Sequence, residues 1–153
     1  MVDSVVLASG SSAHDALHAA LSRVDDADIV VLHDVHRPLA PPSLVVAVLA
    51  AVRAGADAAL PVVEVTETVK EVDDAGLIVR TVPRESLVQE QFPRAVRGAL
   101  LRAAHRSCAA EDPLIPAGSG VVTVLGTPDS VPVHDARDLE FAAAVRAVRA
   151  ARG

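Results

Sequence analysis

A carboxylate and a guanidinium directly follow an apolar run early in the chain. Residues 29–32 read IVVL, and the polar segment HDVHRP occupies residues 33–38. A short unbroken apolar run predicts a strand buried on both faces of a parallel sheet. Ligands of open α/β sheets bind outside the carboxyl ends of strands, where Asp34 and Arg37 would lie. The pattern equally fits a structural role, in which Asp34 caps the next helix and Arg37 pairs with it.

A second candidate for ligand binding lies near the start of the chain. Residues 4–8 predict a strand, residues 14–24 predict a helix, and Gly10, Ser11 and Ser12 connect the two. The N–H groups at the start of a helix attract phosphate, so this connection could bind an anion. One glycine is a weak signal, and either serine also suits a helix N-cap.

Composition limits the classes of function. The 153 residues fit one domain over 1–153, and 51% hydrophobic content supplies a core of small aliphatic side chains. A net charge of −6 argues against nucleic acid or an anionic membrane as a partner. One cysteine and no apolar run of bilayer length predict a soluble cytoplasmic protein.

The remaining pattern predicts a layered α/β fold. Residues 41–54 predict a helix that ends at Gly55, and residues 57–63 predict another buried strand. This order of strands and helices indicates a mostly parallel sheet with right-handed crossovers. Further along, residues 83–93 predict a loop and residues 94–107 predict a helix. Residues 120–125 predict a buried strand, and residues 136–152 predict an amphipathic helix with an apolar inner face.

Residues 65–82 break this pattern. Residues 65–72 alternate apolar and polar side chains, residues 73–76 read DDAG, and residues 77–82 return as a second strand. This predicts a β-hairpin with one covered face. Because an isolated hairpin is marginal in water, we expect residues 64–84 to form a dimerisation arm.

Other chemistry is poorly supported. His14 and His18 have the i, i+4 spacing of a helical zinc site, but the sequence offers no general-base glutamate between them and no obvious third ligand. No G-x-S-x-G motif supports a serine hydrolase. A metal hydrolase is therefore a distant alternative.

Four stretches resemble the methylerythritol phosphate cytidylyltransferases of the non-mevalonate isoprenoid pathway. HDVHRP resembles the family's HDAARP, and PVVEVTETVKEV resembles the segment that opens its dimer arm. TVPR resembles the return of the arm, and FPR resembles the segment before the next helix. The likeness is close from about residue 10 to residue 87 and looser beyond, where residues 126–140 resemble a catalytic loop.

The resemblance implies a three-layer, Rossmann-like nucleotidyltransferase with a mostly parallel sheet and a protruding hairpin arm. Such an enzyme joins CTP to a polyol phosphate with Mg²⁺ and works as a homodimer through residues 64–84. By position, Asp34, Arg37 and Asp129 would be catalytic, with Asp34 and Asp129 at the metal. The nucleotide would lie at Asp34 and the Gly10, Ser11, Ser12 loop, and Arg37 would bind the polyol phosphate with Thr68 and Arg84 of the arm.

The sequence also departs from the family pattern. The glycine-rich loop and two triphosphate-facing lysines have no counterpart, and Lys70, the only lysine, falls on the arm. The chain resembles the family without its first two strand–helix units, so we expect residues 5–8 to pair with residues 29–32. Catalysis is expected to be weak or lost, and the alternative is a non-catalytic dimeric scaffold or regulatory binding module.

Overall fold

A computed structural model describes residues 13–107 and 120–152. The strand expected over residues 5–8 and the candidate residues Gly10, Ser11 and Ser12 lie outside the described residues. The helices are α1 Ala13–Leu21, α2 Pro42–Arg53, α3 Gly98–Ser107 and α4 Ala136–Arg152, with a 3₁₀ turn at Arg84–Ser86. The strands are β1 Ile29–Leu32, β2 Ala58–Glu64, β3 Val69–Val72, β4 Ile78–Val82, β5 Val88–Glu90, β6 Arg94–Arg97 and β7 Val121–Leu125.

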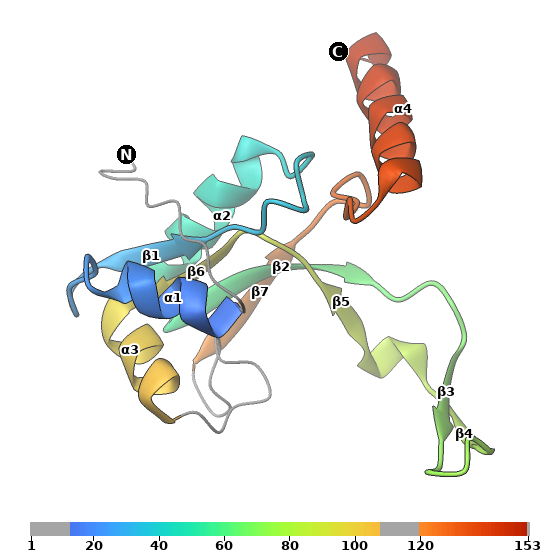
Figure 1. The fold of residues 1–153 in the computed structure, drawn as a ribbon, viewed down its shortest axis with the longest axis horizontal. Coiled ribbons are helices and arrows are strands. Elements are labelled where there is room, and N and C mark those ends of the chain that lie inside the picture. The colour runs from blue at the N-terminus through green and yellow to red at the C-terminus, as the bar shows by residue number, and fades with distance from the viewer. Residues whose placement is uncertain (1–12, 108–119, 153) are drawn as a thin grey trace.

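The sheet is mixed, which corrects the prediction of a mostly parallel sheet. Of the four pairings between described strands of this sheet, three are antiparallel, and only β2 with β7 is parallel. The main difference is β6, which lies between β1 and β2 and runs antiparallel to both (Figure 1). Residues 94–97 were predicted as the start of a helix and residues 88–90 as loop, and both segments pair with β2 as strands.

The direction of the other strands follows from β6. Because β1 and β2 are each antiparallel to β6, they point the same way, and β7 is parallel to β2. The carboxyl ends of β1, β2 and β7 therefore meet at one edge of the sheet. The segments that leave β1 and β7 at this edge carry the candidate residues Asp34, Arg37 and Asp129.

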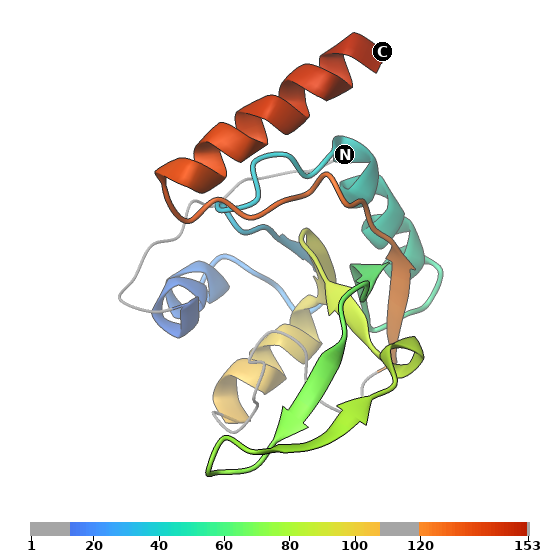
Figure 2. The same ribbon diagram turned by 90° about the vertical axis from the view of Figure 1, so that its right-hand side faces the viewer.

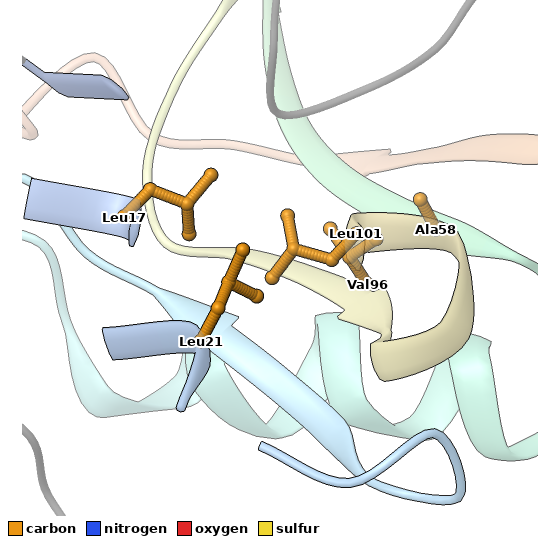
Figure 3. Packing of buried hydrophobic residues seen from close by; sticks show 5 residues of the cluster. All are labelled: Leu17, Leu21, Ala58, Val96 and Leu101. Atoms are coloured by element: carbon orange, nitrogen blue, oxygen red, sulfur yellow. The ribbon is translucent and has the colours of Figure 1, made fainter. Parts of the chain in front are cut away.

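The core forms on both faces of the sheet. One cluster of buried side chains joins α1, α3 and the sheet through Leu17, Leu21, Ala58, Val96 and Leu101 (Figure 3). The other joins α2 to the opposite face through Val48, Val52, Ala59 and Ala95. Successive residues of β2 and β6 serve opposite clusters, as the alternation of a strand requires. The expected three layers are present, with α1 and α3 on one side and α2 on the other (Figure 2).

Several elements are less buried than their apolar sequences predicted. The residues of β1 are only half-buried, and β7 leaves Leu125 88% exposed. On α4, Leu139, Phe141 and Val148 were expected to face inward but are exposed, and Ala142 is buried. These elements lie at the margins: β1 and β7 flank the described sheet, and α4 extends away from the body (Figures 1 and 2).

The predicted hairpin is confirmed, but its predicted covered face is not, because nearly every residue of β3 and β4 is exposed in the single chain. β3 pairs antiparallel with β4, and the Asp73 carboxylate accepts hydrogen bonds from the backbone N–H groups of Ala75 and Leu77. Gly76 has a φ of 79°, a left-handed conformation that glycine adopts without steric cost. The hairpin projects from the body (Figure 1), and within the described residues no helix is long and apolar enough to cross a membrane.

Val48 on α2 provides a direct test of the packing between α2 and the sheet. Its side chain is fully buried, whereas Val46 on the same helix is 67% exposed. We expect Val48→Ala to lower the free energy of unfolding by about 2 kcal/mol, through lost burial and a residual cavity. Val46→Ala is the matched control and should be nearly neutral in urea denaturation. Equal effects of the two changes would contradict the assigned core.

Candidate functional site

Two loops meet at the carboxyl edge of the sheet. The β1 loop comprises residues 33–41, and the β7 loop comprises residues 126–135. Arg37 Nη1 donates a hydrogen bond of 2.6 Å to the backbone carbonyl of Ser130. The N–H of Val133 donates to the carbonyl of His36 at 2.7 Å, and the rings of His36 and His134 lie with centroids 5.1 Å apart. Three independent contacts thus hold the loops side by side.

Asp34 organises the β1 loop. Its Oδ1 accepts from the backbone N–H of His36 and pairs with the ring Nδ1 of His36, both at 2.9 Å. Partial burial raises the pKa of Asp34, but the two hydrogen bonds from His36 and the positive charges of His36 and Arg37 lower it further than burial raises it. The net result is a pKa below the usual value, which keeps the carboxylate ionised.

The structural alternative for this segment holds only in part, because Asp34 does not cap the next helix, whereas the positive charge of Arg37 does act on Asp34. The N-cap of α2 is Pro41, which makes no side-chain capping bond, so Asp34 does not cap that helix. Arg37 binds the carbonyl of Ser130 across to the β7 loop, and Asp34 binds His36. Both candidate residues therefore shape the junction of the two loops.

Asp129 is tied to α4. Arg149 Nε donates to Asp129 Oδ2 at 3.1 Å, and Arg149 Nη1 donates to the carbonyl of Leu39 at 2.9 Å. The guanidinium of one α4 residue thereby binds both the β1 loop and the β7 loop. Asp129 also lines a shallow hollow with Phe141, Val145 and other residues of α4, and that hollow includes neither Asp34 nor Arg37.

Sequence reasoning missed Arg149 because its partners are distant in the chain. It is one of several arginines on a predicted surface helix, and nothing in its local spacing marks it. Asp129 and Leu39 lie 20 and 110 residues away, so only the folded structure brings the three together.

The arm residues lie away from these loops. Thr68 and Arg84 are both exposed, and Arg84 Nη1 donates to the carbonyl of Thr66 at 2.9 Å across the base of the hairpin. Figure 1 shows the hairpin on the far side of the body from α2 and the β1 loop. A single chain therefore brings the loops of Asp34, Arg37 and Asp129 together but leaves Thr68 and Arg84 apart.

Asp34 and Asp129 could hold Mg²⁺ only together with oxygen donors from a bound substrate. Among the described residues, no group of three or more histidine, cysteine, aspartate or glutamate side chains could hold a metal by itself. The two hydrogen bonds between His36 and the Asp34 carboxylate both fall on Oδ1. Magnesium is commonly held by one or two carboxylates plus substrate phosphates. Asp34 and Asp129 supply one carboxylate from each of the two adjoining loops, and Asp129 would have to share its carboxylate with Arg149 to bind the ion.

The chain is similar to known proteins over nearly its whole length. Residues 2–147 match the family model of 2-C-methyl-D-erythritol 4-phosphate cytidylyltransferase. The enzyme of that name from Frankia casuarinae is 45% identical over 127 residues, which cover 82% of this chain and 47% of the relative. The one from Saccharopolyspora erythraea is 36% identical over 151 residues, covering 93% of this chain and 67% of the relative.

Solved structures agree with this likeness. The 2-C-methyl-D-erythritol 4-phosphate cytidylyltransferase of Thermus thermophilus superposes with a TM-score of 0.74 at 30% identity, over 90% of this chain and 70% of the other. The 4-diphosphocytidyl-2C-methyl-D-erythritol synthase of Anaerococcus prevotii has a TM-score of 0.75 at 22% identity, over 88% of this chain and 66% of the other, and supports the fold. The chain spans about half the length of several curated relatives.

The lowered pKa of Asp34 predicts a pH-dependent contribution to stability. A carboxylate with a depressed folded pKa stabilises the fold fully above its unfolded pKa of about 3.9, and loses that effect as pH falls through the folded pKa. We expect Asp34→Asn to be less stable than the parent protein at pH 7, with the difference vanishing towards pH 2 to 3.

Urea denaturation across this pH range measures the difference. The control is Asp74→Asn, because Asp74 is exposed in the hairpin turn, and this change should behave like the parent at every pH. A difference for Asp34→Asn that stays constant down to the lowest pH would contradict the proposed electrostatic origin.

Proposed function

The chain belongs to the 2-C-methyl-D-erythritol 4-phosphate cytidylyltransferase family, and from this premise we propose that it binds CTP and methylerythritol phosphate and joins them slowly. The observation that carries the proposal is the junction of the β1 and β7 loops, where Arg37 binds Ser130. That junction gathers two carboxylates and a guanidinium at the carboxyl edge of the sheet, where ligands of α/β folds bind.

The proposed reaction is a transfer of the cytidylyl group. A phosphate oxygen of methylerythritol phosphate attacks the α-phosphorus of CTP and forms a new P–O bond. The bond from the α-phosphorus to the β-phosphate oxygen breaks, and pyrophosphate leaves with that electron pair. Transfers of this kind depend mainly on positioning and on neutralising charge, so few groups need to exchange protons.

Each candidate residue has a role in this proposal. Asp34 and Asp129 would hold Mg²⁺ together with oxygens of the triphosphate, and Mg²⁺ held there would supply neutralisation of the charge on the phosphates. Arg37 directs one N–H to Ser130, and its remaining guanidinium donors contact a substrate phosphate. The contact expected between the triphosphate and Gly10, Ser11 and Ser12 stays part of the proposal, and these three lie outside the described residues.

The arm completes the site from a second copy. We place Thr68 and Arg84 of one protomer at the methylerythritol phosphate bound by the other, in a homodimer through residues 64–84. The exposed apolar side chains of Leu77, Ile78 and Val79 support this arrangement, since a lone hairpin cannot cover them.

The reason to expect slow transfer is that the two triphosphate-facing lysines of the family pattern have no counterpart in this chain. Lys70, the only lysine of the chain, lies on β3 and donates a hydrogen bond to Thr81 within the arm. Removing one donor that stabilises transition-state charge commonly lowers turnover about 10²- to 10³-fold. The same observation favours a second candidate function, a dimeric binding module that holds the ligands without turnover.

Release of pyrophosphate from CTP tests the enzymatic proposal. With methylerythritol phosphate and Mg²⁺, we expect slow release by the parent protein and at least about tenfold slower release by Asp34→Ala, because a ligand of the metal is lost. Asp74→Ala is the control and should match the parent. No release despite CTP binding would favour the binding module, and unchanged release by Asp34→Ala would contradict the assigned site.

Light scattering tests the dimer. Ile78 is 66% exposed on β4, and Ile78→Glu would place a charge in the proposed interface. We expect this change to convert a dimer of the parent protein into a monomer, while Val46→Glu on the exposed face of α2 leaves the dimer intact. A monomeric parent protein would contradict the homodimer.

A further inference from the structure

Gln91 is a buried amide that binds backbone rather than another side chain. It lies between β5 and β6, and it is only 4% exposed. Its Nε2 donates to the carbonyl of Thr127 at 2.8 Å, and its Oε1 accepts from the N–H of Thr127 at 3.0 Å. The carboxamide thus forms the same paired hydrogen bonds with Thr127 that a neighbouring strand would form.

Thr127 in turn supports the part of the β7 loop that carries Asp129. The carbonyl of Thr127 also accepts from the N–H of Ser130 at 3.1 Å, which closes a turn over residues 127–130. The hydroxyl of Thr127 accepts from the N–H of Asp129 at 3.3 Å. Because Ser130 then accepts from Arg37, a continuous series of hydrogen bonds runs from Gln91 to the β1 loop.

Gln91, at the start of this series of hydrogen bonds, is itself bonded to the backbone of β2. The N–H of Gln91 donates to the carbonyl of Pro61 in β2 at 2.8 Å, and the N–H of Gly126 donates to the carbonyl of Val62 at 2.8 Å. A Cβ atom at Gly126 would collide with Gln91 Oε1 and approach the Val62 carbonyl, so this close approach requires glycine. The β7 loop therefore leaves the sheet at a point fixed by β2 and Gln91 together.

We infer that Gln91 is a positioning residue, which sets the turn over residues 127–130 so that Asp129 and Arg37 face a bound magnesium nucleotide. This inference rests on the proposed function and adds to it a residue that contacts neither ligand. The amide is suited to the task because it supplies one donor and one acceptor in a fixed plane, which matches the N–H and carbonyl of a single residue.

Calorimetric titration with CTP and Mg²⁺ is the first readout. Gln91→Met keeps the size and removes both hydrogen bonds, and we expect about tenfold weaker binding than in the parent, as for the loss of two ordinary hydrogen bonds. Gln89→Met is the matched control, since Gln89 is exposed on β5, and it should bind like the parent. Parent-like binding by Gln91→Met would overturn the inference.

Gln91→Glu adds a readout that a purely structural role would not move. When protonated, its carboxyl group donates to the Thr127 carbonyl and accepts from the Thr127 N–H, as the amide does. When ionised, it places an oxygen against the carbonyl oxygen. Relative to the parent at the same pH, we expect binding within about twofold at pH 6 and about tenfold weaker at pH 8.5, because burial raises the pKa of a carboxyl group into this range. A pH-independent ratio would overturn the inference.

Hydrogen exchange of the free proteins separates this inference from the proposed function. We expect Gln91→Met to speed exchange at the amides of Thr127, Asp129 and Ser130 while the amides of β2 stay protected. Uniformly faster exchange would show general destabilisation and overturn the positioning role. If the parent protein fails to bind CTP, the proposed function fails, and local exchange in the β7 loop still decides whether Gln91 positions it.

Discussion

The antiparallel insertion of β6 between β1 and β2 is the constraint on which the rest of the structure depends. Ala95 and Val96 on this strand are fully buried and face opposite layers, so β6 links α2 on one side to α1 and α3 on the other. Its two pairings also fix β1 and β2 in one direction. The loops that follow β1 and β7 therefore meet at one edge, and a chemically competent site becomes possible there.

Polar contacts fix the positions of the two loops that the strand directions bring to one edge of the sheet. Arg37 joins the β1 loop to Ser130, and Arg149 joins Leu39 to Asp129 from α4. Each guanidinium is satisfied in part by a backbone carbonyl, which leaves donors for an anion in the case of Arg37. Asp129, in contrast, is already paired with Arg149, so binding of a metal by Asp129 would compete with that ion pair. These contacts fix the β1 and β7 loops against each other and against α4.

Local sequence patterns predicted the elements that are defined by neighbouring residues along the chain. The alternation in residues 65–82 and the turn residues DDAG gave the hairpin, and Gly55 with a φ of 118° ends the helix that precedes it. The short strand β6 could not be found in this way. Arg94 and Arg97 look like surface residues, yet Arg94 is buried and pairs with Glu90, and Arg97 donates to the carbonyls of Val52 and Ala56.

The same distinction applies to the site. Asp34 and Arg37 stand out because they follow an apolar run, and Asp129 stands out only through the resemblance to the family. Arg149 and Gln91 act through partners that are distant in sequence, so no local signal marks them. Residues predicted from motifs are those that would touch a ligand, and residues revealed by the structure are those that hold them in place.

Paramagnetic broadening of backbone NMR signals by Mn²⁺ with CTP tests the central claim most directly, because Mn²⁺ replaces Mg²⁺ at carboxylate and phosphate oxygens. The claim is that the β1 and β7 loops form one metal–nucleotide site. It predicts that the amide signals of residues 34–37 and of Thr127, Asp129 and Ser130 broaden together when CTP and Mn²⁺ are both present, and that those of α3 and the hairpin tip do not. Broadening of one loop alone, or of residues elsewhere in the protein, would contradict the claim.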